Sequence, residues 1–370
     1  MTVRTISAAV PASTAPSPRR RDRRSARAYD AESFALVVAA AAFVLCIPVA
    51  TLVFWGRDLP ISGRGSLGEF IAISGGVVAA AAFVLARIVK RRLRGRGPAE
   101  LSRFLWFDVA ALALSYAAIA LLCWLGMATV MEHSFTGAVV FTSPGVVIAA
   151  AATAVTAYIA YLSGADLSAR QLSLVLALFL VAGMLTAMLS SQDPLWWQMN
   201  LSALGMTHDV SALTFNLTLV VSGVIVTTIA RTGTAAVPAD TPQEHRRRTI
   251  VRTFFVLLGV LLACVGVFPV DQFFLLHNTV ATGMAVAFGV LALALPWLLP
   301  AMPRAFQALG YIYVAVVIVL TILFFMGVYN LTAVELIASL LIFSWIIIFL
   351  RNVQDFPAGA TSSTGSEAAS

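Results

Sequence analysis

The stretch FALVVAAAAFVLCIPVATLVFW occupies residues 34–55 and contains no charged side chain. As a helix rising 1.5 Å per residue it reaches about 33 Å, enough to cross a hydrocarbon core of about 30 Å. Nine more apolar segments follow, near Gly68–Val89, Phe104–Ala128, Pro144–Leu162, Gln171–Ser190, Ser211–Ala230, Ile250–Pro269, Leu275–Leu299, Ala308–Val328 and Ala333–Leu350. Strand-like alternation is absent, and backbone groups in lipid must be satisfied within their own segment. We therefore predict an all-α integral membrane protein with ten transmembrane helices.

The composition agrees with this fold class and excludes several functions. Of the 370 residues, 60% are hydrophobic and 11% charged, whereas soluble domains carry about 25% charged residues. The single lysine, Lys90, stands among arginines, so the chain has no P-loop and no intramembrane lysine for a Schiff base. Cys46, Cys123 and Cys264 lie in separate apolar segments without a CxxC motif. We expect no cofactor and no nucleic-acid partner, and we expect membrane lipids as partners.

The basic residues predict the orientation. If the amino terminus is cytoplasmic and the chain alternates sides, 22 of the 24 basic residues face the cytoplasm, and only Arg57 and Arg64 face outward. Such a bias is typical of cytoplasmic loops. We expect both termini in the cytoplasm and the protein in a bacterial plasma membrane.

The same pattern divides the chain into four parts. We predict a disordered basic tail over residues 1–32, a four-helix half over 33–165, a six-helix module over 166–351 and a disordered tail over 352–370. The connection near Val237–Arg248 reads as a cytoplasmic linker that contains His245.

Some intramembrane residues indicate packing or pairing. Gly75 and Gly76 give one helix a small face that lets another helix approach closely. Pro48 and Pro296 should kink their helices. For Asp108, snorkelling or pairing with an arginine competes with a role in a conduction path, and Glu335 is open to the same two interpretations.

Polar and ionisable residues gather on the predicted outer side between Ser190 and Gly283. That side receives Glu69, Glu132, His133, Asp193, His208, Asp209, Asp271 and His277, with Glu335 at its margin. Our candidate site consists of His208, Asp209, Asn216, Asp271, His277 and Asn278. If the sixth helix extends back to His208, the spacing places His208, Asn216 and Gly223 near one face.

Three interpretations of this cluster remain open. The first is interface chemistry, with Trp196 and Trp197 in an aromatic belt and Asp271 capping the eighth helix. The second is a polar pocket between helices six, seven and eight that binds a lipid headgroup or small solute. The third is a hydrolytic or metal site of His208, His277 and Asp271, although no HxxxH, HExxH or GxSxG motif occurs and we assign no metal.

The motifs WWQMNLSALG, FNLTLVVSG and GVFPVDQFFLLHN carry a family resemblance. They resemble a prokaryotic multispanning membrane family of the domain-of-unknown-function series, family nine-nine-eight, and look distantly like the Frag/DRAM/Sfk group. The matching positions are Ser202–Gly205, Phe215–Asn216, Gly266–Pro269 with Asp271, and His277, within about residues 171–350. The family's usual Ser-Asp-Leu-Gly is Ser-Ala-Leu-Gly here, which weakens the case for a catalytic acid. The resemblance implies a fold and a polar centre rather than a reaction.

The sequence thus favours a non-enzymatic lipid- or envelope-associated membrane protein with a polar pocket on its outer face. The alternatives are a secondary transporter of a small solute and a membrane-embedded hydrolase that uses the His and Asp cluster. Transporters usually carry ionisable residues or broken helices near the midplane, and here only Asp108 and Glu335 come near it.

Overall fold

The structure is a computed structural model that describes residues 18–93, 103–166, 168–206, 209–234, 237 and 239–354. Ten of the helices in this described part are long and apolar enough to cross a membrane, which confirms the predicted all-helical, ten-span class. The elements in chain order are α1 (Pro18–Phe54), β1 (Leu59–Pro60), α2 (Leu67–Leu93), α3 (Arg103–Ser134), β2 (Val139–Val140), α4 (Thr142–Ala165), α5 (Ala169–Leu189), η2 (Trp196–Gln198), η3 (Leu201–Gly205), α6 (Val210–Gly233), α7 (Pro242–Val267), α8 (Phe274–Leu298), α9 (Arg304–Phe325) and α10 (Leu331–Gln354).

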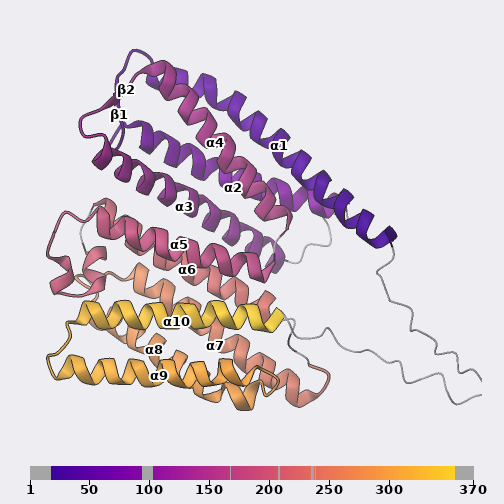
Figure 1. The fold of residues 1–370 in the computed structure, drawn as a ribbon, viewed down its shortest axis with the longest axis vertical. Helices are drawn as coiled ribbons and strands as arrows, with labels where there is room; N and C mark the ends of the chain where they lie inside the picture. Colours follow the sequence, from indigo (N-terminus) through magenta and orange to yellow (C-terminus); the bar gives the residue numbers. More distant parts are fainter. Residues whose placement is uncertain are drawn as a thin grey trace, which may run out of the picture.

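The helices lie in two neighbouring groups (Figure 1). Helix α4 packs on α1 and α2, and α2 packs on α3, whereas α5 to α10 pack mainly on one another. Helix α3 joins the groups because it also packs on α5 and α6. The short strands β1 and β2 pair antiparallel, with Leu59 opposite Val140, and link two loops at one end of the bundle. The described chain begins and ends at the opposite end (Figure 1).

Small residues bring helices close together in both groups. A Cβ atom added at Gly76 would lie 3.2 Å from the Ala117 carbonyl of α3, which confirms the predicted close approach. The contact between α6 and α7 is tighter, because a Cβ at Gly223 would lie 2.3 Å from the Gly259 carbonyl. A Cβ at Gly266 would lie 2.5 Å from the Asn216 carbonyl. Glycines therefore set the α6–α7 spacing directly below the polar end of the bundle.

An aromatic cluster fills the centre of the second group. Trp345 of α10 is fully buried, and its ring lies 5.1 Å from that of Phe306 and 5.4 Å from that of Phe288. The rings of Phe255 and Phe349 are tilted against each other, with a centroid distance of 4.5 Å. These side chains come from α7, α8, α9 and α10, so the cluster holds four helices together below the polar end.

Several helices are longer than predicted. Helix α1 begins at Pro18, within the tail predicted over residues 1–32, and residues 1–17 lie outside the described part. Arginine and alanine favour helix, and proline is tolerated in a first turn. Helix α3 continues to Ser134 and includes His133. Helix α10 continues to Gln354, so residues 352–354 are helical too.

The predicted linker near residues 237–248 is partly helical. Helix α7 begins at Pro242, and its capping box joins the side chain of Thr241 to the Glu244 N–H and the side chain of Glu244 to the Thr241 N–H. His245 therefore lies in the first turn of a helix rather than in a loop. The T-x-x-E spacing with proline between is a known helix-start signal.

Asp108 pairs with an arginine. Its Oδ1 lies 3.4 Å from Nη1 of Arg231, at the end of α6 far from the site described below. Pairing is therefore the correct one of the two interpretations.

Candidate functional site

The connection between α5 and α6 forms no membrane-length helix, and its η3 segment is buried. We call residues 195–206, which include η2 and η3, the plug. All residues from Leu201 to Gly205 are buried, and Leu201 and Leu204 pack with Phe215 and Leu219 of α6. Irregular backbone at such a place needs internal hydrogen-bond partners, and five polar side chains supply hydrogen bonds that hold the plug.

His277 of α8 supplies the first. Its side chain is 3% exposed, its Nδ1 lies 2.7 Å from the Phe268 carbonyl oxygen, and its Nε2 lies 3.0 Å from Oγ of Ser202. A carbonyl oxygen can only accept, so Nδ1 donates. In the neutral ring Nε2 is then an acceptor, and the Ser202 hydroxyl donates to it. One imidazole thus joins the plug to the turn after α7.

Glu335 of α10 supplies the second. Its Oε2 accepts a 2.6 Å hydrogen bond from the Leu201 N–H, and the Ser202 N–H also donates to the carboxylate. Such charge-assisted bonds are about twice as strong as neutral ones. Nearby, Nδ2 of Asn330 donates to the Trp197 carbonyl at 2.9 Å. The start of α10 therefore holds the η2–η3 segment at two points.

Asn216 and Ser211 of α6 hold the other side of the plug. Nδ2 of Asn216 donates to the Gly205 carbonyl at 3.0 Å. The Ser211 hydroxyl lies 2.8 Å from the Ala187 carbonyl and 3.3 Å from the Leu204 carbonyl. The plug is consequently fixed to α6, α8 and α10 together.

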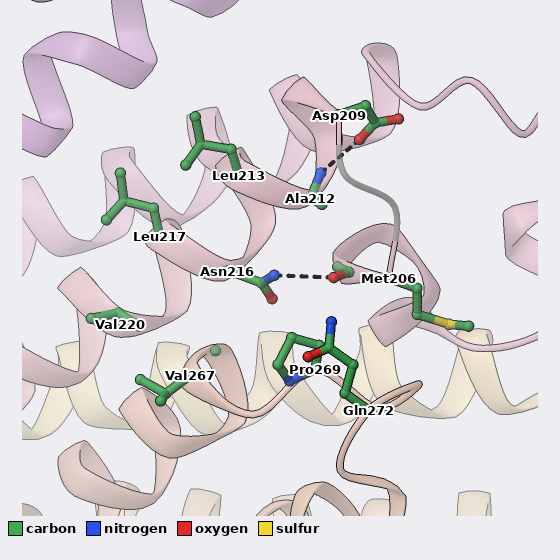
Figure 2. A pocket seen from close by; sticks show the side chains of 12 residues that line it. Met206, Asp209, Ala212, Leu213, Asn216, Leu217, Val220, Val267, Pro269 and Gln272 are labelled. Carbon is green, nitrogen blue, oxygen red and sulfur yellow. Dashed lines mark hydrogen bonds between the residues drawn. The ribbon is translucent and has the colours of Figure 1, made fainter.

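A groove of about 470 Å³ runs between the plug, α6 and the end of α7. Figure 2 shows its lining, with Asp209 at one end and the Asn216 amide facing the plug. The lining residues are Gly205, Met206, Asp209, Ala212, Leu213, Asn216, Leu217, Val220, Gly266, Val267, Pro269 and Gln272.

The groove has a carboxylate at one end, and its lining along α6 is mainly apolar. Leu213, Leu217 and Val220 follow Asp209 at helical spacing on one face of α6. Leu213 and Val267 are exposed although they lie in candidate membrane spans. These two exposed side chains place part of the apolar lining at the surface of the helices, where a membrane protein meets lipid.

A second, smaller pocket of about 290 Å³ lies beside the groove and shares Asp209 with it. Its lining comes from the loop after α1, the end of α3, the end of α5 and the start of α6. These residues are Ser62, Thr129, His133, Leu189, Ser190, Ser191, Gln192, Asp209 and Val210. This pocket thus lies where the two helix groups meet.

The structure separates the predicted site residues into three sets. Asp209 and Asn216 line the groove, and His277 is buried against the plug. Asp271 and Asn278 are exposed, and neither lines the groove or the second pocket. His208 lies outside the described residues, and α6 begins after it, at Val210.

The predicted cap by Asp271 is wrong. The N-cap residue of α8 is Phe273, which makes no side-chain capping hydrogen bond. The Phe273 and Gln272 N–H groups instead bond to the Pro269 carbonyl, so a backbone turn shapes this helix start.

Several site residues were not among the predicted ones. The sequence places Glu335 only at the margin of the polar cluster, Ser202 belongs only to the family resemblance, and Gln272 carries no sequence signal. An acidic side chain in an apolar segment needs a partner, so Glu335 carried a usable signal. Its partner could not be read from the sequence, because the two N–H groups belong to a loop more than 130 residues away.

The arrangement does not resemble a metal centre. Among the described residues, no three His, Cys, Asp or Glu side chains gather in a way that could hold a metal ion. Both ring nitrogens of His277 already have protein partners.

Comparisons of the chain with protein-family models, with curated proteins and with solved structures gave no match. The fold and site define a polytopic membrane protein with ten candidate spans and a polar-ended groove.

Proposed function

We propose that this protein is a non-enzymatic, lipid-binding protein of a bacterial plasma membrane, with both termini in the cytoplasm and the plug on the outer side. The observation that carries lipid binding is the groove along α6. The Asp209 carboxylate lies at one end, the Asn216 amide lies among the aliphatic side chains along α6, and the exposed side chains of Leu213 and Val267 form part of the lining. An amphiphile with a polar headgroup and a hydrocarbon chain matches this polarity.

The orientation rests on the charges. The described chain begins and ends at one end of the bundle, and the plug lies at the other (Figure 1). The arginine-rich loops belong to the end that carries the termini, and such loops favour the cytoplasm. Membership of the family of unknown function that the motifs resemble is part of the same proposal.

The hydrolase alternative has one observation in its favour, the Ser202–His277 hydrogen bond. An acyl-transfer serine also needs N–H donors aimed at the developing oxyanion. The N–H groups of Leu201 and Ser202 already donate to Glu335, and Ser202 lines neither the groove nor the second pocket. These contacts favour a structural role for the Ser202–His277 hydrogen bond over a catalytic role.

The transporter alternative has less support. The Asp108 carboxylate is paired with Arg231, and Glu335 is engaged by the plug. Each of the ten spans is a continuous helix within the described residues, whereas transporter sites are commonly built from broken helices.

Photocrosslinking tests the lipid site. The purified full chain is placed in vesicles that contain a phospholipid with a diazirine near the end of one acyl chain. We expect crosslinks on α6 and α7 around Leu217 and Val267. Filling the groove with Leu217→Trp or Val220→Trp should remove most of them, because an indole occupies the aliphatic channel.

Leu340→Trp is the matched control, since Leu340 is 66% exposed on α10 and lies outside the groove. Annular lipid contacts should survive in all variants. Equal α6 crosslinking in the wild type and both groove variants would refute the lipid site.

A further inference from the structure

The second pocket, between His133 of α3 and Asp209 before α6, has several hydrogen-bond acceptors in its lining. Three of its four hydroxyl groups already donate to backbone carbonyls. Thr129 Oγ1 donates to Leu125 at 3.0 Å, Ser190 Oγ to Thr186 at 2.7 Å, and Ser191 Oγ to Asp193 at 3.2 Å. Because each hydroxyl has one proton, these oxygens offer lone pairs to a ligand.

The histidine that lines the pocket also offers a hydrogen-bond acceptor. Nδ1 of His133 lies 2.8 Å from the Thr129 carbonyl oxygen, which can only accept, so Nδ1 carries the proton. In the neutral ring Nε2 is consequently a hydrogen-bond acceptor. The His133 side chain is exposed, so this nitrogen is within reach of a ligand.

The pocket also carries negative charge. Asp209 contributes a carboxylate, whose Oδ1 accepts the Ala212 N–H at 3.0 Å and thereby starts α6. No lysine or arginine is among the residues that line the pocket. A lining with several acceptor groups and a carboxylate matches a cationic ligand that has several N–H donors.

We propose that this pocket binds a primary ammonium group. An R–NH₃⁺ group has three donors and one positive charge, and a volume of about 290 Å³ accommodates such a headgroup. The same chemistry has two sources, the headgroup of an ethanolamine phospholipid and a free small amine. The proposal does not rest on the lipid groove, because apart from Asp209 its residues are different.

A trimethylated headgroup separates hydrogen bonding from charge. Phosphatidylethanolamine and phosphatidylcholine with identical acyl chains both carry a positive nitrogen, but only the first has N–H donors. Native mass spectrometry of the full chain with equal amounts of both lipids should show preferential ethanolamine adducts. We expect about tenfold preference, the effect of losing one hydrogen bond to a charged group.

Single-residue variants test whether this pocket causes the preference for the ethanolamine lipid. His133→Lys places a competing cation in the pocket, and His245→Lys makes the same change at an exposed position in the first turn of α7. His133→Lys should abolish the preference, whereas His245→Lys should retain it. Asp209→Asn should weaken the adducts of both lipids, because both headgroups carry a positive nitrogen, while its amide oxygen still accepts the Ala212 N–H. Unchanged melting temperatures show that the variants fold.

Free ethanolamine distinguishes the two sources. If it displaces the phosphatidylethanolamine adduct while choline does not, the pocket binds the amine by itself. If it displaces nothing, the preference belongs to the phospholipid headgroup. Equal binding of the two lipids, or a preference that His133→Lys leaves intact, overturns the proposal.

Discussion

The Ser202 hydroxyl and the His277 imidazole, 75 positions apart in the chain, share a 3.0 Å hydrogen bond that fastens the plug to α8. The other ring nitrogen is hydrogen-bonded too, because Nδ1 donates to the Phe268 carbonyl oxygen at 2.7 Å. Both nitrogens of a buried ring are therefore satisfied, as buried polar groups require.

His277→Ala should destabilise the protein by about 2–4 kcal/mol, because the Phe268 carbonyl loses its side-chain donor and a cavity remains. Chemical denaturation in detergent measures this loss. Ser202→Ala should cost less, and a double-mutant cycle should give about 0.5–2 kcal/mol of coupling, the range of hydrogen bonds in membrane proteins. His245→Ala, at an exposed position, is the control and should have little effect. Additive effects of the Ser202 and His277 changes would contradict a stabilising hydrogen bond between the two side chains.

Glu335→Leu should release the plug, because the N–H groups of Leu201 and Ser202 lose their charged acceptor. Glu335→Gln keeps one oxygen and should release it less. A cysteine introduced at Ala203, which is 5% exposed, reports the opening in a background without the three native cysteines. Its maleimide reaction should accelerate at least about tenfold with Glu335→Leu, as a loss of more than about 1.4 kcal/mol implies. No acceleration would mean that the carboxylate does not hold the plug.

Gly223→Ala should be strongly destabilising, because the new Cβ would lie 2.3 Å from the Gly259 carbonyl and 2.7 Å from the Ala263 nitrogen. Both contacts are backbone, so the two helices must separate. Gly289→Ala is the matched control, since nothing lies within 4 Å of its added Cβ. Melting temperatures in detergent should fall for the first change and stay equal or rise for the second. Similar melting temperatures for both variants would contradict the tight α6–α7 contact.

A fluorophosphonate probe should fail to label Ser202 in the native protein. The backbone N–H groups of Leu201 and Ser202 already donate to Glu335, and the Ser202 hydroxyl lies in a buried segment. Mass spectrometry of a tryptic digest checks the result, with a serine hydrolase added as a positive control. Stoichiometric labelling that disappears in Ser202→Ala would revive the hydrolase alternative.

Cysteines at Gln192 and Thr241 should be labelled from opposite sides of the membrane. Both residues are exposed, the first after α5 and the second before α7. In intact bacterial cells an impermeant maleimide should reach position 192 but not position 241, and permeabilisation should expose position 241. Labelling of both positions in intact cells would refute the orientation.

The sequence by itself determined the fold class and the number of spans. Each span is a local property, because a run of about 20 apolar residues must form a helix to satisfy its backbone in lipid. The close approach at Gly76 and the pairing of Asp108 were also accessible, since small faces and buried charges restrict their partners. Helix ends were less accurate where local signals compete, as at Pro18, Pro242 and Ser134.

Only the tertiary structure decided which polar residues meet. Asp271 and His277 are six residues apart, yet one is exposed and the other bonds to Ser202. Glu335 holds a loop from a different part of the chain, and Asp209 lies between two pockets. These relations depend on how α6, α8 and α10 pack around the plug. Hydrophobicity places each helix in a membrane, but the direction of a polar side chain follows from contacts between distant segments.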